Sequence, residues 1–460
     1  MSERADAAHV APRPVEPVRL ADGRGIRLPP LHDGRVMLGA ALLFTGVGGP
    51  ALRNALGWWA WGAIVIAGLL TAIVWLVRER CRVPWGAVPY SLRLWLILAA
   101  LSLIWSHYRL ETLLGLSLLV AAVVAAMPLA TLLTRSQMLD ALALMSRWLL
   151  GLSIVFELVV AWFIRHPIGP AWMDKSPDDL LKLEMWSRNV LFVDGKIQGV
   201  LGNSTMLGTA AAIALIAFGL QWWRDRHVRV WHGAWALLAL TIVALTRSAG
   251  VIVALLATAA ALVLALATRR TSTRRARGIL TLVMLGAAGI VVAVIAFFTE
   301  PVLELFGKDS TLTGRTGIWE TVVGLAAQHP VVGWGWTGYW MPWTEPFDGL
   351  VVVNGVEQLH AHNAWLDVWL QLGFIGVLAF AMLVARVFMR AWLAATSRPR
   401  RSLTDPRPFK PETLLPLLVV VFLVVQSVSE SHLLVEGWWV VFAMLAIGLS
   451  AREFRDPELR

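Results

Sequence analysis

Long apolar runs alternate with short polar segments along most of this chain, and the pattern predicts an all-α integral membrane protein. About twenty consecutive apolar residues cross the hydrocarbon core of a bilayer as one helix. We predict about twelve transmembrane helices, at 36–52, 57–77, 90–106, 111–131, 144–164, 201–221, 230–247, 248–268, 279–299, 363–390, 414–429 and 433–450. The polar segment 1–35 is rich in Arg and Pro, and we expect a disordered tail rather than a cleavable signal peptide.

The distribution of Lys and Arg predicts how these helices are oriented. If both termini, including the tail 451–460, lie in the cytoplasm, 30 of the 40 basic residues fall in cytoplasmic segments and helix ends. This excess is typical of cytoplasmic loops. The opposite orientation would place the arginine-rich segments 269–277 and 398–410 outside the cell.

Composition supports the membrane class. The chain is 58% hydrophobic and only 15% charged, with a mean hydropathy of +0.67 and 25 Trp. Because the net charge of +10 follows from the orientation of the helices, it does not indicate a nucleic-acid partner. Cys81 is the only cysteine, which excludes an internal disulfide and a cysteine-based metal site.

Within the membrane domain 36–450, two outer segments are long: 165–200, and 300–362 between the ninth and tenth helices. Long loops frequently carry function. In the first, Ser176 as an N-cap, Pro177 and two first-turn acids predict a short helix on the membrane surface. In the second, glycines and aromatic residues over 333–340 predict tight turns and flat apolar faces.

Several titratable residues near the outer face are candidates for chemistry. We predict that His362 occupies the first turn of the helix 363–390, close to His360; the simpler role is a ring that reaches toward water. Glu157 is the one carboxylate well inside a predicted span, and it either pairs with an arginine of the site or reaches water at the outer leaflet. At the last outer turn, Glu430, His432 and Glu436 are expected to rim the same cavity.

The order and spacing of several short motifs resemble the signature of the O-antigen ligase family, a superfamily of bacterial membrane proteins that includes O-antigen and exopolysaccharide polymerases. The resemblance covers about residues 195–385. Its motifs are Gly202-Asn203, Thr246-Arg247-Ser248, Gly314-Arg315-Thr316 with Trp319, His329-Pro330 before Gly333-Trp334-Gly335, and His362-Asn363 ahead of Leu366, Gly373 and Gly376.

The resemblance implies transfer of a glycan from a polyprenyl (undecaprenyl) diphosphate carrier to an acceptor hydroxyl, at the outer face of the bacterial cytoplasmic (inner) membrane. The family's three functional positions fall on Arg247, Arg315 and His362. Arginines present planar sets of donors to diphosphate oxygens, and an imidazole can take the proton of the acceptor hydroxyl. Direct attack on the anomeric carbon, without a covalent intermediate, predicts inversion of the sugar linkage.

Alternatives remain open for individual residues. Arg247 either binds diphosphate or reaches the membrane surface, and Arg315 either binds diphosphate or pairs with Glu320 or loop carbonyls. Further candidates for substrate binding are Asn363, expected to orient His362, Trp319, His360 as a substitute base, Glu157, and Tyr339 and Trp336, which either stack on sugars or belong to an interfacial aromatic belt.

The outer segments contain no His-x-x-x-His and no paired-carboxylate ligand set, so we expect no metal and no cofactor. The expected partners are the lipid-linked glycan donor, a glycan or lipid-glycan acceptor, and membrane lipids. The residues do not distinguish a ligase from a polysaccharide polymerase. A transporter of lipid-linked oligosaccharides is the alternative from another class, but such transporters usually have two similar halves, and no internal repeat is apparent.

Overall fold

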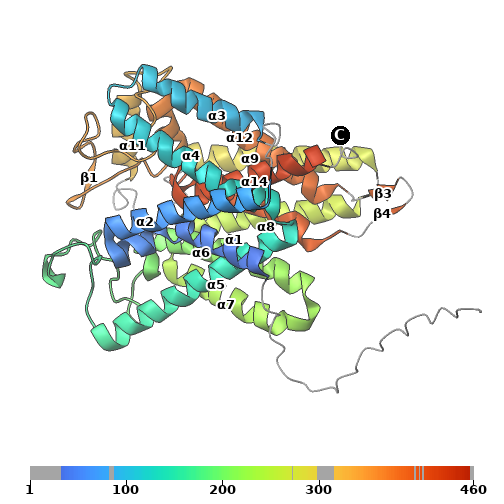
Figure 1. Cartoon of the computed structure of the whole chain (residues 1–460), viewed down its shortest axis with the longest axis horizontal. Helices are drawn as coiled ribbons and strands as arrows, with labels where there is room; N and C mark the ends of the chain where they lie inside the picture. Colours follow the sequence, from blue (N-terminus) through green and yellow to red (C-terminus); the bar gives the residue numbers. More distant parts are fainter. Residues whose placement is uncertain are drawn as a thin grey trace, which may run out of the picture.

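The computed structural model describes residues 33–81, 88–271, 273–297, 315–397, 400–402, 405–406 and 409–455. These residues are mainly helical, as predicted (Figure 1). The helices are α1 (Gly34–Val47), α2 (Gly49–Arg78), α3 (Tyr90–Leu101), α4 (Arg109–Leu132), α5 (Arg135–Val159), α6 (Ser204–Arg224), α7 (Arg229–Thr246), α8 (Ala249–Arg270), α9 (Arg274–Phe297), α11 (Arg315–Ala326), α12 (Ala364–Thr396), α13 (Leu415–Gln426) and α14 (Glu436–Arg455).

A helix lies in each of the twelve predicted ranges, and α14 continues to Arg455, past the predicted start of the C-terminal tail at 451. Seven helices in the described part of the chain are long and apolar enough to cross a membrane: α2, α4, α5 with its extension to Ile164, α6, α7 with its preceding turn, α8 and α12. The chain is therefore a multi-pass membrane protein, while the number of twelve crossings stays a prediction. Most of the predicted tail 1–35 and the loop segment 298–314 lie outside the described residues.

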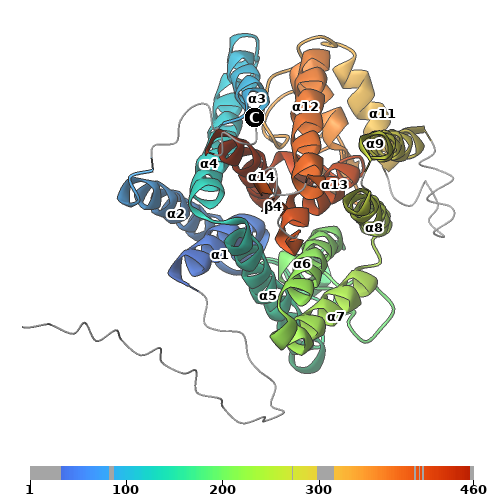
Figure 2. The ribbon, with the colours of Figure 1, turned by 90° about the vertical axis from the view of Figure 1, so that its right-hand side faces the viewer.

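Two short helices form the centre of the bundle. Almost every residue of α13 is buried, and α14 is buried from Trp438 to Ile447. Figure 2 shows α13 and α14 enclosed by α4, α1, α6, α8 and α12, with α2 at the margin beside α4. Because these central helices contact protein on all sides, their sequences are apolar all round rather than on one face.

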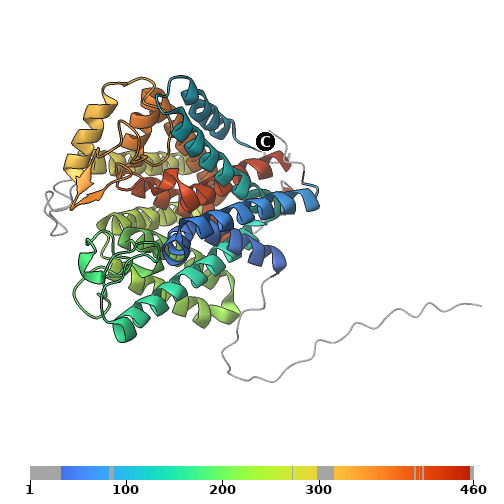
Figure 3. The same cartoon turned by 60° about the vertical axis from the view of Figure 1, so that its left-hand side comes forward.

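The polar residues divide between the two ends of the bundle. At one end, hydrogen bonds join Arg35 to Glu79, Gln137 to Asp33 and Arg269 to Thr413. The two long loop segments lie together at the other end, on the left of Figures 1 and 3. The second segment includes α11 and a hairpin of β1 (Val352–Val353) and β2 (Val356–Glu357); the remaining strands, β3 (Arg400–Ser402) and β4 (Asp405–Pro406), follow α12.

The surface helix predicted after Ser176 was wrong in extent. Only one 3-10 turn forms, over Pro177–Asp179, and the backbone is extended again at Leu180. The Ser176 hydroxyl donates to the Asp179 carboxylate, 2.6 Å away, instead of capping backbone N–H groups. A turn without a side-chain cap gains little from continuing as a helix.

Helix α12 is broken at Gly373, and the preceding loop inserts into the break. Gly373 has φ +63°, and the N–H groups of the next two residues, Phe374 and Ile375, donate to the carbonyls of Pro330 and Val331. In return, Trp334 and Gly335 donate to the carbonyls of Leu370 and Gln371, at 3.0 and 2.8 Å. The loop backbone therefore takes over hydrogen bonds that an unbroken helix would make within itself.

Gly373→Ala should lower the unfolding temperature of the purified protein in detergent. A Cβ atom at this position would lie 2.2 Å from the carbonyl carbon of Val331, and positive φ disfavours a side chain. We expect a destabilisation of at least about 2 kcal/mol. The matched control is Gly324→Ala in α11, where a Cβ would meet nothing within 4 Å. Equal unfolding temperatures for the two variants would contradict the inserted loop.

Candidate active site

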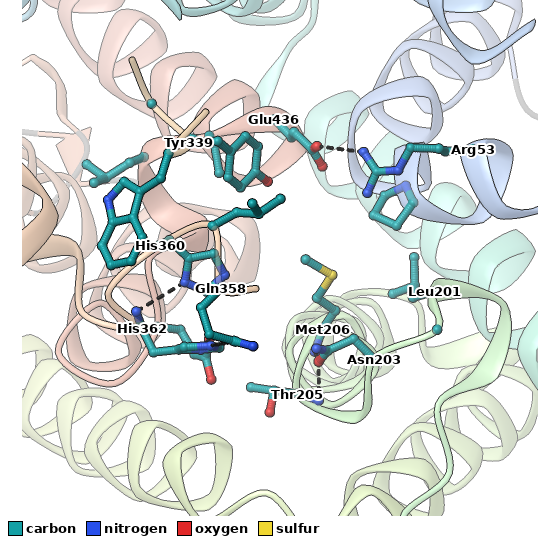
Figure 4. A pocket seen from close by; sticks show the side chains of 18 of the residues that line it. Arg53, Leu201, Asn203, Thr205, Met206, Tyr339, Gln358, His360, His362 and Glu436 are labelled. Carbon is teal, nitrogen blue, oxygen red and sulfur yellow. Dashed lines mark hydrogen bonds and ion pairs between the residues drawn. The ribbon is translucent and has the colours of Figure 1, made fainter. Parts of the chain in front are cut away.

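A cavity of about 1310 Å³ opens at the end of the bundle that carries the two long loops. Its wall is built from segments far apart in the sequence: the start of α2, part of α4, the start of α6, the loops around α11 and before α12, and the start of α14. Figure 4 shows His360 and His362 on one side of this cavity and Arg53 with Glu436 across from them. Among the predicted residues, Arg315, Tyr339 and Trp336 also line it.

A buried carboxylate, Glu430, joins two of the predicted catalytic residues. Its Oε1 lies 2.7 Å from Arg315 Nη2 and its Oε2 lies 3.0 Å from His362 Nδ1. The Glu430 side chain is only 4% exposed. Burial alone would raise the pKa of Glu430, but His362 and Arg315 hold that pKa well below its usual range. Glu430 is therefore ionised at neutral pH and holds the other two side chains in place.

Asp367 ties together the two loops that supply this cluster. Its carboxylate accepts hydrogen bonds from the Ala361 N–H, at 3.1 and 3.2 Å, and from the Ser431 hydroxyl. Ala361 precedes His362 and Ser431 follows Glu430, so one side chain of α12 sets the position of both functional residues. The prediction that Glu430 and Glu436 rim the cavity is confirmed, whereas His432 is buried outside the lining.

His362 does not occupy the first turn of the helix, as the sequence suggested. Helix α12 begins at Ala364, its N-cap is Asn363, and His362 precedes the cap with φ +51°. Asn363 Oδ1 accepts from the N–H groups of Trp365 and Leu366, so Asn363 caps the helix and does not orient the imidazole. Orientation comes instead from Glu430, which accepts from Nδ1; Gln358 Oε1 lies 3.3 Å from Nε2, and this nitrogen can donate to it only when the ring is charged.

His360 holds the backbone of His362 in place. The Nδ1 atom of His360 accepts the backbone N–H of His362 at 3.1 Å, and the two rings are 4.1 Å apart. Burial first, and then the neighbouring His362 and His432, hold the pKa of His360 well below its usual value. A ring that stays neutral and is a weak base fits a supporting role better than proton transfer.

Arg247 stands apart from this cluster. It ends α7 with φ +48°, its side chain is 53% exposed, and it forms an ion pair with Asp194 in the first long loop. Its neighbours Thr246 and Ser248 line the cavity, but the Arg247 side chain is not in the lining. The structure therefore brings Arg315 and His362 together and leaves Arg247 at the same end of the bundle, paired with Asp194 and outside the cavity lining.

Neither role predicted for Glu157 is correct. Its side chain is 1% exposed, and its carboxylate accepts from the N–H groups of Gln198 and Gly199, at 3.0 and 2.7 Å, and from the Ser187 hydroxyl. It thus meets neither water nor an arginine within the described residues. Glu157 fixes the end of the first long loop against α5, a structural role.

The three predicted aromatic residues lie in different surroundings. Trp319 Nε1 donates to the carbonyl of Ala361 and supports the histidine loop. Trp336 is 1% exposed and packs edge-on against Trp95, so its role is in the core. Tyr339 faces Glu436 in the cavity; burial, followed by the charge of Glu436, raises its pKa well above the usual value. Tyr339 therefore keeps its proton and can donate a hydrogen bond.

Two residues of the site were not predicted, namely Arg53 and Gln358. Arg53 Nη1 lies 3.3 Å from Glu436 Oε1, and the guanidinium stacks on Trp58 and Trp61. The signal in the sequence was a lone arginine followed by tryptophans in an outer turn, which has no specificity without its distant partner.

Arg315 pairs with Glu430 rather than with Glu320, the partner considered from the sequence. Within the described residues, no three His, Cys, Asp or Glu side chains are grouped to hold a metal.

Comparison with known proteins confirms the resemblance over the part of the chain that holds Arg247, Arg315 and His362. Residues 234–381 match the family model described as O-antigen ligase. The exopolysaccharide production protein ExoQ of Rhizobium meliloti (strain 1021) is 29% identical over 152 residues, which are 32% of this chain and 33% of that protein. The match thus spans about a third of the length of the curated relative.

Glu430→Gln should lower the unfolding temperature at neutral pH because Arg315 loses its counter-ion. Folding lowers the pKa of Glu430. Its stabilising contribution is therefore fully present above the ordinary glutamate pKa and is lost as the pH falls below that value. The difference in unfolding temperature between wild type and variant should therefore be constant from about pH 8 to 5 and shrink below about pH 4. Glu320→Gln, at an exposed position of α11, is the control. A difference that shrinks already between pH 7 and 5 would contradict the assigned ionisation.

Proposed function

We propose that the chain is a membrane glycosyltransferase that uses a polyprenyl diphosphate-linked glycan as donor, because residues 234–381 match the family model described as O-antigen ligase. It transfers or polymerises this glycan onto an acceptor hydroxyl at the outer face of the cytoplasmic membrane, for surface polysaccharide assembly. The observation that carries the proposal is the Arg315–Glu430–His362 cluster on the wall of a large cavity at one end of a membrane bundle.

His362 acts as the general base. With its Nδ1–H donated to Glu430, the Nε2 atom is the one that takes the proton of the acceptor hydroxyl. The resulting imidazolium donates to Glu430 on one side and to Gln358 Oε1 on the other. A carboxylate that holds an imidazole in one tautomer and stabilises its charged form is a known arrangement in hydrolases.

The bond changes balance without a cofactor. The acceptor oxygen forms a bond to the anomeric carbon as its proton moves to His362, and the bond from that carbon to the diphosphate oxygen breaks. The electron pair leaves with the diphosphate, whose developing charge is neutralised by arginine. Arg315 is in contact with the same carboxylate as His362, which links charge neutralisation to the base. A single displacement inverts the anomeric configuration.

Further observations support the proposed orientation and reaction class. Basic residues are concentrated at the end of the bundle opposite the cavity, which supports a cavity that faces outward and cytoplasmic termini. The relative ExoQ carries a name from exopolysaccharide production, and this favours polymerisation, in which the acceptor is a second lipid-linked glycan, over ligation to another kind of molecule.

Purified protein in lipid nanodiscs should transfer glycan from a polyprenyl diphosphate donor without nucleotide and in the presence of EDTA. His362→Ala should lower the rate by about 10²–10⁴-fold, because the base is lost. His360→Ala, the matched control, should lower it far less. Activity that disappears with EDTA and returns with magnesium would contradict the metal-independent reaction, and full activity of His362→Ala would remove the assigned base.

Single-cysteine labelling should establish the outward face. In a Cys81→Ser background, cysteines at Gly195 and Asp348 should react with a membrane-impermeant maleimide in intact cells. Cysteines at Arg274 and Ser402 should react only after the membrane is opened, because they lie at the basic end. Protection of Asp348→Cys in intact cells would place the cavity on the cytoplasmic side and exclude an exported glycan as substrate.

A further inference from the structure

The cavity continues away from His362 as an apolar groove between α1, α2 and α4. Leu42 of α1, Val65 and Leu69 of α2, and Leu118, Ala122 and Ala125 of α4 line this part. Helix α2 is broken at Gly57, and from Trp58 to Leu69 the groove follows eleven residues of its second part, on the order of 16 Å, which is about half the thickness of a hydrocarbon core. Small residues on α4 leave room between the two helices.

The groove is placed where a membrane lipid can enter it. Helix α2 lies at the margin of the bundle beside α4 (Figure 2), and many of its apolar side chains, such as Ile66 and Leu70, are exposed. A lipid tail that moves from the bilayer into this groove leaves one apolar environment for another. It then gains contacts with the groove walls rather than a hydrophobic driving force.

Arg53 provides a cation at the head of the groove. Its side chain is 19% exposed, and Trp58 and Trp61 lie 4.6 and 5.5 Å from its guanidinium carbon, which holds the planar group against the wall. Its ion pair within the described chain is a single contact of 3.3 Å with Glu436, so most of the five guanidinium donors are free for an anion. Across the cavity, Arg315 is already held by Glu430.

These observations together describe a site for an amphiphile with an anionic head. We propose that Arg53 binds the diphosphate of the lipid carrier and that the α1–α2–α4 groove holds its polyprenyl tail. This inference rests on the proposed function and specifies its donor site. It places the diphosphate anchor on α2, outside the stretch that matches the family model, and not on Arg247, which is outside the cavity lining and paired with Asp194.

Affinity for undecaprenyl diphosphate, measured with the full chain in nanodiscs, tests the anchor. Arg53→Gln should weaken binding by about tenfold or more, since charge-assisted hydrogen bonds are lost. Glu436→Gln should strengthen binding, because it removes the carboxylate that competes for Arg53. If the ion pair were only structural, the two variants would lower stability and affinity alike, and that result would overturn the assignment.

Photo-crosslinking with a polyprenyl diphosphate that carries a diazirine near the end of its tail tests the groove. Crosslinks should fall in the peptides that contain 65–69 and 114–125. Val65→Trp, which fills the groove, should reduce them by about tenfold or more, whereas Ile66→Trp, on the exposed side of α2, should leave them unchanged within about twofold. Crosslinks on other helices, or equal competition by phosphatidylglycerol, would overturn the proposal.

The outcomes separate this site from the proposed reaction. Crosslinks in the groove without glycan transfer by the wild-type protein would support the lipid site and remove the glycosyltransferase function. Transfer that depends on His362, combined with crosslinks elsewhere, would leave the reaction in place and overturn the groove.

Discussion

The arrangement of the whole site depends on the insertion of loop 330–335 into the break of α12. A helix inside a membrane must satisfy its own backbone groups, and the break at Gly373 is tolerated because the loop supplies the missing partners. Gln371, fully buried beside the break, also accepts the N–H groups of Thr337 and Gly338. The glycine-rich loop is thereby fixed to the bundle, and the wall of the cavity that contains Tyr339 becomes rigid.

Electrostatics then assembles the Arg315–Glu430–His362 cluster. A buried carboxylate is costly without partners, and Glu430 has an arginine from α11 and an imidazole from the loop before α12. In the sequence, His362 lies 68 residues from Glu430, and Arg315 lies 115 residues from it. The need of one buried charge for two cations or donors therefore brings together segments that local structure alone would not join.

Hydropathy was sufficient to predict the helices and the two long loops, because the bilayer requires long apolar runs. The resemblance predicted Arg315 and His362 as site residues, and both line the cavity. The partnership of Glu430, the capping role of Asn363 and the burial of Glu157 were missed, since each is decided by contacts between distant segments. The surface helix after Ser176 failed for a local reason: the Ser176 hydroxyl donates to the Asp179 carboxylate three residues on and does not cap the backbone.

Under the proposed function, a lipid-linked donor also explains why the residues assigned to the site lie where helices end. The tail of such a donor stays in the bilayer, so its diphosphate and the bond to the sugar are held at the level of the membrane surface. Arg53 near the start of α2, Arg315 at the start of α11 and His362 just before α12 all line the same cavity, at the end of the bundle that carries the two long loops. The apolar groove ends beside Arg53. In the proposed reaction, two substrates that meet in this cavity need not cross the membrane.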